Sequence, residues 1–308
     1  MKEIVVLENV TKKYGNRVAI QDISVSFEEG KITGFLGLNG AGKTTTMKII
    51  TTYFKPNSGK VYVDSLDVSE NPYRVRKLMG YLPENFPIYD NLTILDFLRF
   101  VALAKDVEEV DKEVERVIEL VGIKDYKNRF LRELSKGYKQ RVGIAQAIIG
   151  NPKVIILDEP TQGLDPAQII EIRKLIKDLS HDKTIILSTH IMQEVEAICD
   201  NVAIIHKGRI KMSGKIQELK AKTQNQLTVE YLFDQLDENK KEKVKNLIQE
   251  FGLDPVFDTN SIRINIKRDE EEKVKEINKK FYDNGLYFLY VNRNALTMEN
   301  LFLEAIKE

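Results

Sequence analysis

The first chemistry that the sequence indicates is phosphate binding, at residues 37–44, GLNGAGKT. They match the pattern G-x-x-x-x-G-K-[ST] in full and lie between an apolar run, KITGFLG, and a helical pattern. Glycines in this pattern let the backbone wrap a phosphate chain with its N–H groups. Lys43 is expected to reach the β- and γ-phosphates, and the Thr44 hydroxyl to ligate Mg²⁺. The predicted nucleotide contacts of the loop are Gly37, Leu38, Asn39, Gly40, Ala41, Gly42, Lys43, Thr44 and Thr45.

A second group of polar residues follows two apolar runs, VIILDEP (154–160) and TIILSTH (184–190). Asp158 is expected to hold Mg²⁺, because ligands of parallel sheets collect at the carboxyl ends of strands. Glu159 points another way and is expected to activate the attacking water, a role that contributes about 10²–10⁴ in rate. The alternative for Glu159 is an exposed charge at a strand end. His190 ends the next run on the same rim, where a γ-phosphate role is favoured over a satisfied core histidine.

A third stretch, LSKGYKQR (134–141), places Ser135 and Gly137 just before an apolar helical pattern. A helix N-terminus leaves backbone N–H groups unpaired and carries partial positive charge, so it attracts anions. Serine is also a common helix cap. From these residues alone, both a simple cap and a phosphate contact stay open.

The elements that must position these residues are predicted from periodicity. EIVVLENV and ISVSFEE alternate as half-buried strands do, whereas KVIILDEP and TIILSTH are continuous apolar runs, typical of strands buried on both faces. Between the last two lies PAQIIEIRKLIKDLS, with apolar residues at helical spacing, so the three form a βαβ unit. Residues 202–213 are predicted to form a hairpin that turns at Lys207-Gly208. The fold class is therefore α/β with a parallel sheet.

The length of 308 residues indicates one domain of ordinary size and one small domain. A polar stretch at 214–226 is the predicted boundary, which gives domains at 1–215 and 223–308. Beyond it the pattern predicts strands at LTVEYL, SIRINIK and YFLYVN, helices at about 237–251 and 269–284, and a last helix at MENLFLEAIK. This order is typical of a small α+β domain, and no residue in it looks catalytic.

Composition narrows the function classes. Lys plus Arg equals Asp plus Glu, 47 each, and a net charge of zero argues against a dedicated nucleic-acid binder. One cysteine, Cys199, excludes an internal disulfide and fits a reducing compartment, where it is expected to be a small buried residue. No apolar run approaches the roughly 20 residues of a membrane span, and the start lacks a signal core. The chain is expected in the cytosol.

Seven motifs occur in order: Tyr14, GLNGAGKT, GYLPEN (80–85), LSKGYKQR, VIILDEP, GLDP (163–166) and STH. Over residues 1–215 the chain resembles the nucleotide-binding subunit of an ABC transporter, and it is most similar to export ATPases of the drug, lantibiotic and gliding-motility type. The segment LTMENLFLEAI is similar to the end of that group. The resemblance implies a P-loop ATPase with a mixed sheet core, an antiparallel β subdomain and a helical subdomain at about 84–134, plus the C-terminal α+β domain.

The resemblance also implies roles by position. LSKGY lies where the family carries its signature, usually LSGGQ, so Ser135, Lys136 and Gly137 would meet ATP held by a second subunit. Asp165 would belong to the loop that links the two sites. Tyr14 would stack on adenine, worth about 1–3 kcal/mol per base in nucleic-acid sites; the alternative is an ordinary aromatic at a strand end. ATP would then join two subunits into a dimer, expected to be a homodimer.

The sequence departs from the family pattern in two places. The signature carries Lys136 and Tyr138 where glycine and glutamine are usual, and the added charge would either favour the γ-phosphate or only be solvated. Glu84 stands where the family usually has glutamine. A carboxylate binds Mg²⁺ readily but would repel the γ-phosphate without the metal, so the metal role of Glu84 stays open. Because Lys43, Asp158, Glu159 and His190 are all present, an active hydrolase is expected.

The resemblance implies an ATPase that powers a separate permease from the cytoplasmic face of the cell membrane, with ATP and Mg²⁺ as cofactors and no nucleic-acid partner. The alternative is an ABC ATPase that acts on ribosomes or DNA. Translation-type members usually carry two ATPase units, and repair-type members insert long coiled coils, but neither feature is present here. A small-molecule kinase or GTPase would account for the first motif alone. The signature, Glu159 and His190 disfavour it.

Overall fold

The computed structural model describes residues 2–87, 89–295 and 297–307, and the chain divides into two compact units, Met1–Ile216 and Gln217–Glu308. Two clusters of buried apolar side chains lie in the first unit and one lies in the second. Each unit therefore has a hydrophobic core of its own, as independently folding domains do. None of the helices in these described ranges is both long and apolar enough to cross a bilayer.

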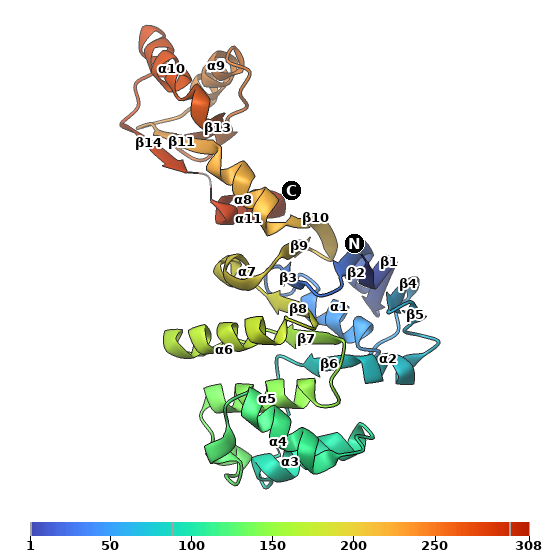
Figure 1. Cartoon of the computed structure of the whole chain (residues 1–308). Helices are drawn as coiled ribbons and strands as arrows, with labels where there is room; N and C mark the ends of the chain where they lie inside the picture. Colours follow the sequence, from blue (N-terminus) through green and yellow to red (C-terminus); the bar gives the residue numbers. More distant parts are fainter. Residues whose placement is uncertain (1, 88, 296, 308) are drawn as a thin grey trace. The chain divides into compact units, whose positions relative to one another are not determined.

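The centre of the first unit is a six-stranded sheet with the order β10-β9-β3-β8-β7-β6 (Figure 1). Its strands are β3 (Ile32–Leu36), β6 (Met79–Leu82), β7 (Val154–Asp158), β8 (Thr184–Thr189), β9 (Asn201–His206) and β10 (Arg209–Lys215). All neighbours pair in parallel except β9 and β10, which form the predicted hairpin with Lys207 and Gly208 at its turn. Every residue of β3, β7 and β8 is buried, so the prediction of strands covered on both faces is confirmed.

The two faces of this sheet belong to different cores. Side chains alternate along each strand, so Ile155 and Leu157 join the core beneath the helices, while Val154 and Ile156 join the core beneath a second sheet. That second sheet is antiparallel, with the order β2-β1-β4-β5. Its strands are β1 (Glu3–Tyr14), β2 (Arg17–Glu28), β4 (Ser58–Val63) and β5 (Leu66–Asp67).

Seven α-helices are described in the first unit: α1 (Lys43–Ile50), α2 (Pro72–Leu78), α3 (Ile94–Ala104), α4 (Val110–Leu120), α5 (Lys136–Ile148), α6 (Pro166–Leu179) and α7 (Met192–Ile198). Helices α3, α4 and α5 pack together, and two short 3-10 turns, η1 (Lys124–Tyr126) and η2 (Leu131–Glu133), lie between α4 and α5. Thr93 caps α3, and its hydroxyl accepts a hydrogen bond from the Asp96 N–H. The mixed sheet, the antiparallel sheet and the helical bundle are the three parts that the family resemblance implied.

The second unit is built on a four-stranded antiparallel sheet with the order β12-β13-β11-β14. Its elements are α8 (Ile216–Gln224), β11 (Gln226–Leu232), α9 (Glu238–Gln249), β12 (Val256–Phe257), β13 (Ser261–Lys267), η3 (Arg268–Glu270), α10 (Glu272–Asp283), β14 (Tyr290–Ala295) and α11 (Met298–Lys307). From β11 to β14 the order is βαββαβ, a split βαβ arrangement. Most of the polar stretch at 214–226 forms helix α8, while Gly214 and Lys215 end β10 and Gln226 begins β11.

The predicted strand YFLYVN (287–292) is displaced, because β14 begins only at Tyr290. Pairing with β11 decides this start, since Tyr290 lies opposite Leu232, the last residue of β11. Strand β12 was not predicted, and it is only two residues long. Leu296, in the closing segment that resembled the family, lies outside the described residues.

Candidate nucleotide site

The loop between β3 and α1 ends in a backbone conformation that only glycine adopts without strain. Gly42 has a φ of 114°, and a Cβ on it would lie 2.7 Å from Ile20 Cγ2. At the other end, a Cβ on Gly37 would lie 2.5 Å from the carbonyl oxygen of Ile205. Both glycines therefore allow the loop to pack closely against neighbouring strands. The loop then runs directly into the N-terminus of α1, where backbone N–H groups favour phosphate.

Lys43 is the first residue of α1, and its ammonium group is held inside the site. Nζ donates to the carbonyl oxygens of Gly37 at 2.8 Å and Leu38 at 3.4 Å, and it lies 3.2 Å from Glu159 Oε1. The side chains of Lys43 and Glu159 are each only 6% exposed. A buried cation and a buried carboxylate are tolerable only when they are paired in this way.

A cavity of about 500 Å³ opens beside this pair. It brings together most of the residues predicted for nucleotide and metal: Tyr14, Asn39, Gly40, Gly42, Lys43, Thr44, Thr45, Glu84 and Glu159. Of the other predicted loop residues, Gly37 and Ala41 are buried behind the lining, and Leu38 points to the surface. The volume is within the usual range for small-molecule sites.

Three lining residues were missed by sequence reasoning: Arg17, Val18 and Ala19. They open strand β2, which pairs with β1 so that Arg17 lies opposite Tyr14. Val18 and Tyr14 are each 44% exposed although both are apolar, and Tyr14 packs edge-on against Phe54 with ring centroids 5.8 Å apart. The only signal in the sequence was the tight Gly15-Asn16 turn, which returns the chain to Tyr14.

Asp158 supplies a carboxylate that makes no hydrogen bond of good geometry with the described residues, although the Ser188 and Thr44 hydroxyls lie near it. The residue is fully buried, and among the described residues neither carboxylate oxygen accepts a hydrogen bond. Burial raises its pKa, and the nearby Glu84 and Glu159 carboxylates add to the rise, while the hydroxyls of Ser188 and Thr44 oppose it. A buried, unpaired carboxylate is costly unless a cation completes it. With the Thr44 hydroxyl close by, the oxygen donors fit Mg²⁺, which prefers one or two carboxylates and phosphate oxygens.

Glu159 is turned toward the cavity by its own backbone. It has a φ of 53°, an uncommon left-handed conformation for a residue with a side chain. Its N–H donates to Ser188 O at 2.9 Å, and Oε2 lies 2.9 Å from His190 Nδ1. Glu159 is thus buried rather than exposed at the strand end, and a base with an orienting histidine is a recurrent catalytic arrangement.

The signature residues lie elsewhere on the first unit. Ser135 caps α5, and its hydroxyl accepts a hydrogen bond from Tyr138 N at 3.5 Å, so the capping alternative describes the local geometry. Ser135 and Gly137 line a second cavity of about 380 Å³, and the residues that line it include none from the first cavity. Within one chain, the structure therefore does not bring Ser135 to Lys43.

The other predicted residues of this surface have structural partners as well. The Lys136 ammonium lies against Gly163, in the space that a Cβ on that glycine would need. Tyr138, the second departure from the family pattern, stacks on Tyr126 with ring centroids 4.1 Å apart. Asp165 is exposed and caps α6, where its Oδ1 accepts from Gln168 N at 2.9 Å. The signature and the loop before α6 are thus neighbours.

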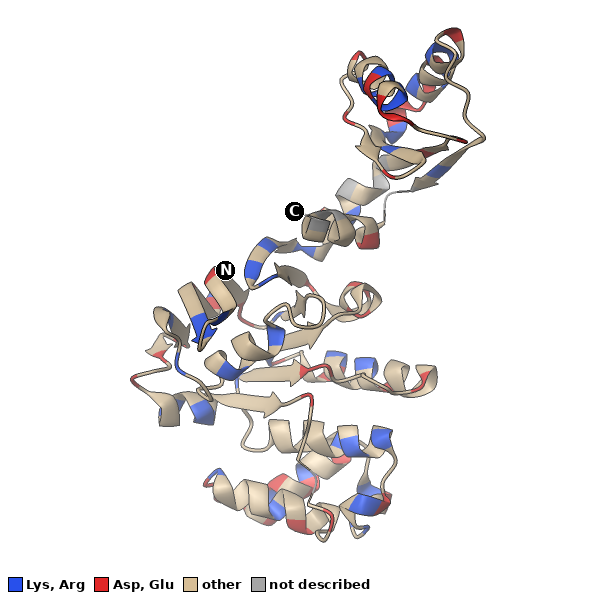
Figure 2. Cartoon of the chain, turned by 180° about the vertical axis from the view of Figure 1, so that it is seen from behind, with Lys and Arg blue, Asp and Glu red and all other residues tan. Residues whose placement is uncertain are grey.

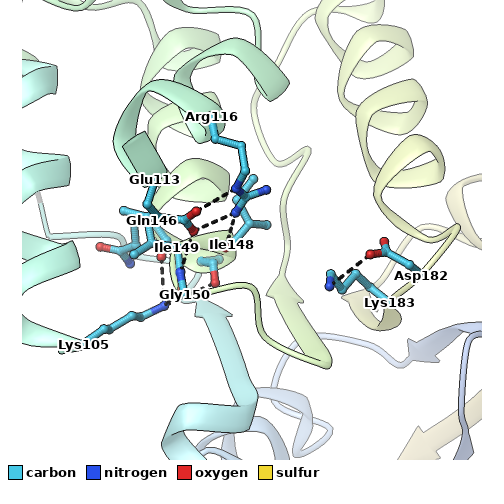
Figure 3. A network of polar contacts seen from close by, with 10 residues as sticks. Lys105, Glu113, Arg116, Gln146, Ile148, Ile149, Gly150, Asp182 and Lys183 are labelled. Carbon is cyan, nitrogen blue, oxygen red and sulfur yellow. Dashed lines mark hydrogen bonds and ion pairs between the residues drawn. The ribbon is translucent and has the colours of Figure 1, made fainter. Parts of the chain in front are cut away.

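Helix α5, which carries the signature at its N-terminus, is anchored at its C-terminus by two cations (Figure 3). Lys105 Nζ donates to the carbonyl oxygens of Gln146, Ala147 and Ile149 at 3.2, 3.4 and 2.8 Å. Arg116 donates to the Ile148 carbonyl at 3.3 Å and forms two hydrogen bonds of 2.7 Å with the carboxylate of Glu113. Four carbonyls that a helix end leaves unpaired are therefore all satisfied.

Comparison with known proteins places these features in one family. The profile of the ABC transporter family matches residues 20–162. The bacitracin transport ATP-binding protein BcrA of Enterococcus faecalis is 35% identical over 310 residues, covering 99% of this chain and 97% of that protein. BcrA of Bacillus licheniformis is 32% identical over 310 residues, covering 99% and 98%.

Two solved structures are similar to the first unit. The dimeric structure of MJ0796, a bacterial ABC transporter cassette, has a TM-score of 0.64 and 26% identity, and covers 69% of this chain and 99% of that one. The dimeric post-hydrolysis state of the same cassette, bound to ADP and Pi, has a TM-score of 0.63 and 27% identity, with the same coverage.

Proposed function

This chain belongs to the family of ABC transporter ATP-binding proteins, and we propose that it drives an exporter whose membrane-spanning permease is a separate protein. It binds and hydrolyses ATP, as members of that family do. The observation that carries the proposal is that Lys43 and Glu159 line one cavity, with His190 in contact with Glu159, while Ser135 lines a different cavity of the same unit. The transport relatives do not favour the alternative of a ribosome or DNA ATPase.

ATP fits the cavity in one orientation, with its phosphates at the loop and its adenine ring at the opposite end. The phosphates lie along the loop and the N-terminus of α1, within reach of Lys43. The adenine ring lies against the side chains of Tyr14 and Val18, which line the cavity and are partly exposed. The Thr44 hydroxyl and the Asp158 carboxylate would hold Mg²⁺, with Glu84 lining the same cavity as Thr44, and the ion would supply positive charge to offset that of the phosphates.

The residues of this chain then act on water. The γ-phosphate competes with Glu159 for Lys43, because both are anions within reach of one ammonium group. Glu159, released from that pair, accepts a proton from the water that attacks the γ-phosphorus, and ADP is the leaving group. His190 holds the Glu159 carboxylate in place through the 2.9 Å contact. The products are ADP and inorganic phosphate.

A second copy of this chain completes the site. Ser135 and the Gly137 backbone approach the γ-phosphate held by the partner, and the positive end of α5 and the Lys136 ammonium favour that anion. The proposal rests on the separation of the two cavities within one chain. Both cavities are lined by residues of the first unit, so the domain at 223–308 is proposed as an accessory domain without catalytic residues.

The permease is proposed to dock on the helical part of the first unit. Phe100 and Leu103 are more than half exposed on one face of α3, and Tyr89 packs against Phe100 with ring centroids 6.2 Å apart. Beyond the end of α3 lies a cavity of about 520 Å³, lined by Tyr73, Arg76, Lys77, Met79, Ala104, Lys105, Asp106, Val107, Glu108, Ile149 and Gly150. An exposed apolar row beside a cavity with a charged rim suits an amphipathic helix. Docking there would hold the chain at the cytoplasmic face of the cell membrane.

The cargo is proposed from the relatives. Two proteins that match along the whole chain, at 35% and 32% identity, are named for bacitracin transport. An exported peptide antibiotic is therefore the proposed class of substrate. Selectivity among such peptides is expected to reside in the permease.

The test is ATP-dependent dimerisation of the Glu159→Gln variant, measured by light scattering. The substitution removes the base but keeps the nucleotide contacts, so Mg-ATP should accumulate a dimer that ADP does not support. Adding Ser135→Arg should return the protein to a monomer, because the arginine fills the place of the partner's γ-phosphate. A Gln193→Ala change in the same background, on an exposed position of α7, is the matched control. A monomer at saturating Mg-ATP would contradict the shared site.

A further inference from the structure

Glu194 is a buried carboxylate that the mechanism above does not use. It lies in the first turn of α7 and is only 1% exposed. Oε2 accepts a hydrogen bond of 2.6 Å from the Thr189 hydroxyl, and Oε1 accepts one from the Thr161 hydroxyl. Both threonines are buried too. Burying a carboxylate costs free energy unless its oxygens accept hydrogen bonds, and both oxygens of Glu194 do so. A glutamate placed at this cost indicates a specific structural role.

The two threonines adjoin the proposed catalytic pair, since Thr161 lies in the loop after β7 and Thr189 ends strand β8. Thr161 lies two residues after Glu159, and Thr189 lies directly before His190. The Thr189 hydroxyl also accepts from Ile191 N at 3.1 Å, which fixes the chain just beyond His190. The Thr189 carbonyl accepts from Gly37 N at 3.2 Å. Glu194 is thus connected to the loops after β3, β7 and β8 at once.

We propose that Glu194 is a positioning residue, which sets the separation between Glu159 and His190 by binding Thr161 and Thr189 from behind. The inference rests on the proposed role of Glu159 as the base. On the cavity side the two loops meet through the 2.9 Å contact between His190 Nδ1 and Glu159 Oε2. On the buried side the Glu194 carboxylate joins Thr161 to Thr189, so three side-chain contacts, together with the backbone hydrogen bond from Glu159 N to Ser188 O, link the two segments.

The chemistry of the side chain accounts for a glutamate at this place. Two hydroxyl donors need two acceptors, and a carboxylate offers both. Alanine would leave two buried hydroxyls unpaired, and the loops would be free to shift relative to each other. Glutamine has the same length and keeps one acceptor, while its amide donates to the second hydroxyl oxygen. Aspartate is one methylene shorter and reaches only one of the two threonines.

The experiment is steady-state ATP hydrolysis by the full chain and its Glu194→Ala, Glu194→Asp and Glu194→Gln variants. For the alanine and aspartate variants we expect kcat to fall about 10- to 100-fold, since small displacements of reacting groups cost rates of that order, with KM for ATP nearly unchanged. Glutamine should restore most of kcat. Gln193→Ala, which changes the exposed neighbour on α7, should match the wild type. Wild-type kcat in the alanine variant, or a raised KM with unchanged kcat, would overturn the inference.

A double-mutant cycle separates positioning from simple loss of stability. Thr161→Val and Thr189→Val together remove the hydroxyls through which Glu194 acts, so adding Glu194→Ala should lower kcat little further. Independent, multiplicative losses would overturn the proposal. If the alanine variant does not fold, as judged by thermal unfolding, the Thr161→Val single variant carries the same test of kcat. Glu159→Gln serves as the reference: wild-type hydrolysis by that variant would refute the base assignment itself, whatever Glu194 does.

Discussion

The charged side chains of Lys43 and Glu159 lie almost entirely inside the protein, where each is the ion-pair partner of the other. Their 3.2 Å contact and the two loop carbonyls satisfy the Lys43 ammonium. Asp158 differs, because its carboxylate is buried without a partner. The proposed binding of phosphate and Mg²⁺ therefore rests on one paired cation, Lys43, and one buried anion without a hydrogen bond, Asp158.

At this scale the test is Lys43→Met. The variant loses a charge-assisted contact with the phosphates, worth about 1.5–3 kcal/mol, which corresponds to roughly a 10- to 150-fold weaker Kd for Mg-ATP. Isothermal titration calorimetry measures this directly. Lys60→Met removes an exposed lysine of β4 and should leave the Kd unchanged. An affinity within twofold of the wild type in the Lys43 variant would show that the ammonium does not bind the phosphates.

Among the elements, helix α5 connects two sites. Ser135 begins it beside the second cavity, and Lys105 and Arg116 hold its last carbonyls beside the cavity proposed for the permease. Helix α5 is also tied to α6 by the 2.7 Å ion pair of Arg141 with Glu171. Under the proposed docking, α5 would connect the permease surface at one end to the signature at the other.

The contribution of Lys105 to the free energy of unfolding is expected to depend on pH. Burial lowers the pKa of Lys105 to about 8, with the Glu113 carboxylate opposing the shift, while the unfolded chain keeps a value near 10.5. Between these values the unfolded state binds more protons, so the free energy of unfolding rises with pH by up to about 1.4 kcal/mol per unit. Below pH 8 both states are protonated and this gain is absent.

Urea unfolding of wild type and Lys105→Met at pH 7, 9 and 10 isolates the effect, because all other groups are common to both proteins. The stability of the wild type relative to the variant should rise from pH 8 toward 10.5. A difference that stays constant across this range would mean that the Lys105 ammonium titrates as an exposed lysine does.

At the scale of the whole molecule, charged residues lie mainly on the helices and are rare on the central strands (Figure 2). Figure 2 shows Lys and Arg interspersed with Asp and Glu on the helices, while the central strands carry almost no charge. The net charge of zero agrees with this pattern. A net charge of zero gives the chain no overall attraction to an anionic membrane or nucleic acid, and an apolar contact with a permease is the proposed means of docking.

The double variant Phe100→Glu, Leu103→Glu tests this at the scale of the assembly. Two carboxylates in the exposed apolar row should prevent docking, so the protein should no longer be recovered with membranes that contain its permease. Hydrolysis by the isolated chain should persist, because neither side chain lines the nucleotide cavity. As a control, Tyr282→Glu changes an equally exposed aromatic residue of the second unit. Unchanged recovery of the double variant would exclude this face.

The sequence by itself determined the phosphate loop, the strands that flank it and the positions of Asp158, Glu159 and His190. These depend on consecutive residues, since a glycine-rich turn, a continuous apolar run and a helix cap are all set by near neighbours in the chain. Two buried runs joined by a helix also imply a parallel sheet, so the carboxyl ends of both strands fall on one edge.

Only the tertiary structure decided which distant side chains meet. Val18 reaches the cavity because β2 pairs with β1, and Lys105 reaches carbonyls more than 40 residues away. Glu194 joins Thr161 across 33 residues, and β14 takes its start from β11 rather than from its own alternation. Such contacts arise from packing between elements, and neither local propensity nor periodicity carries that information.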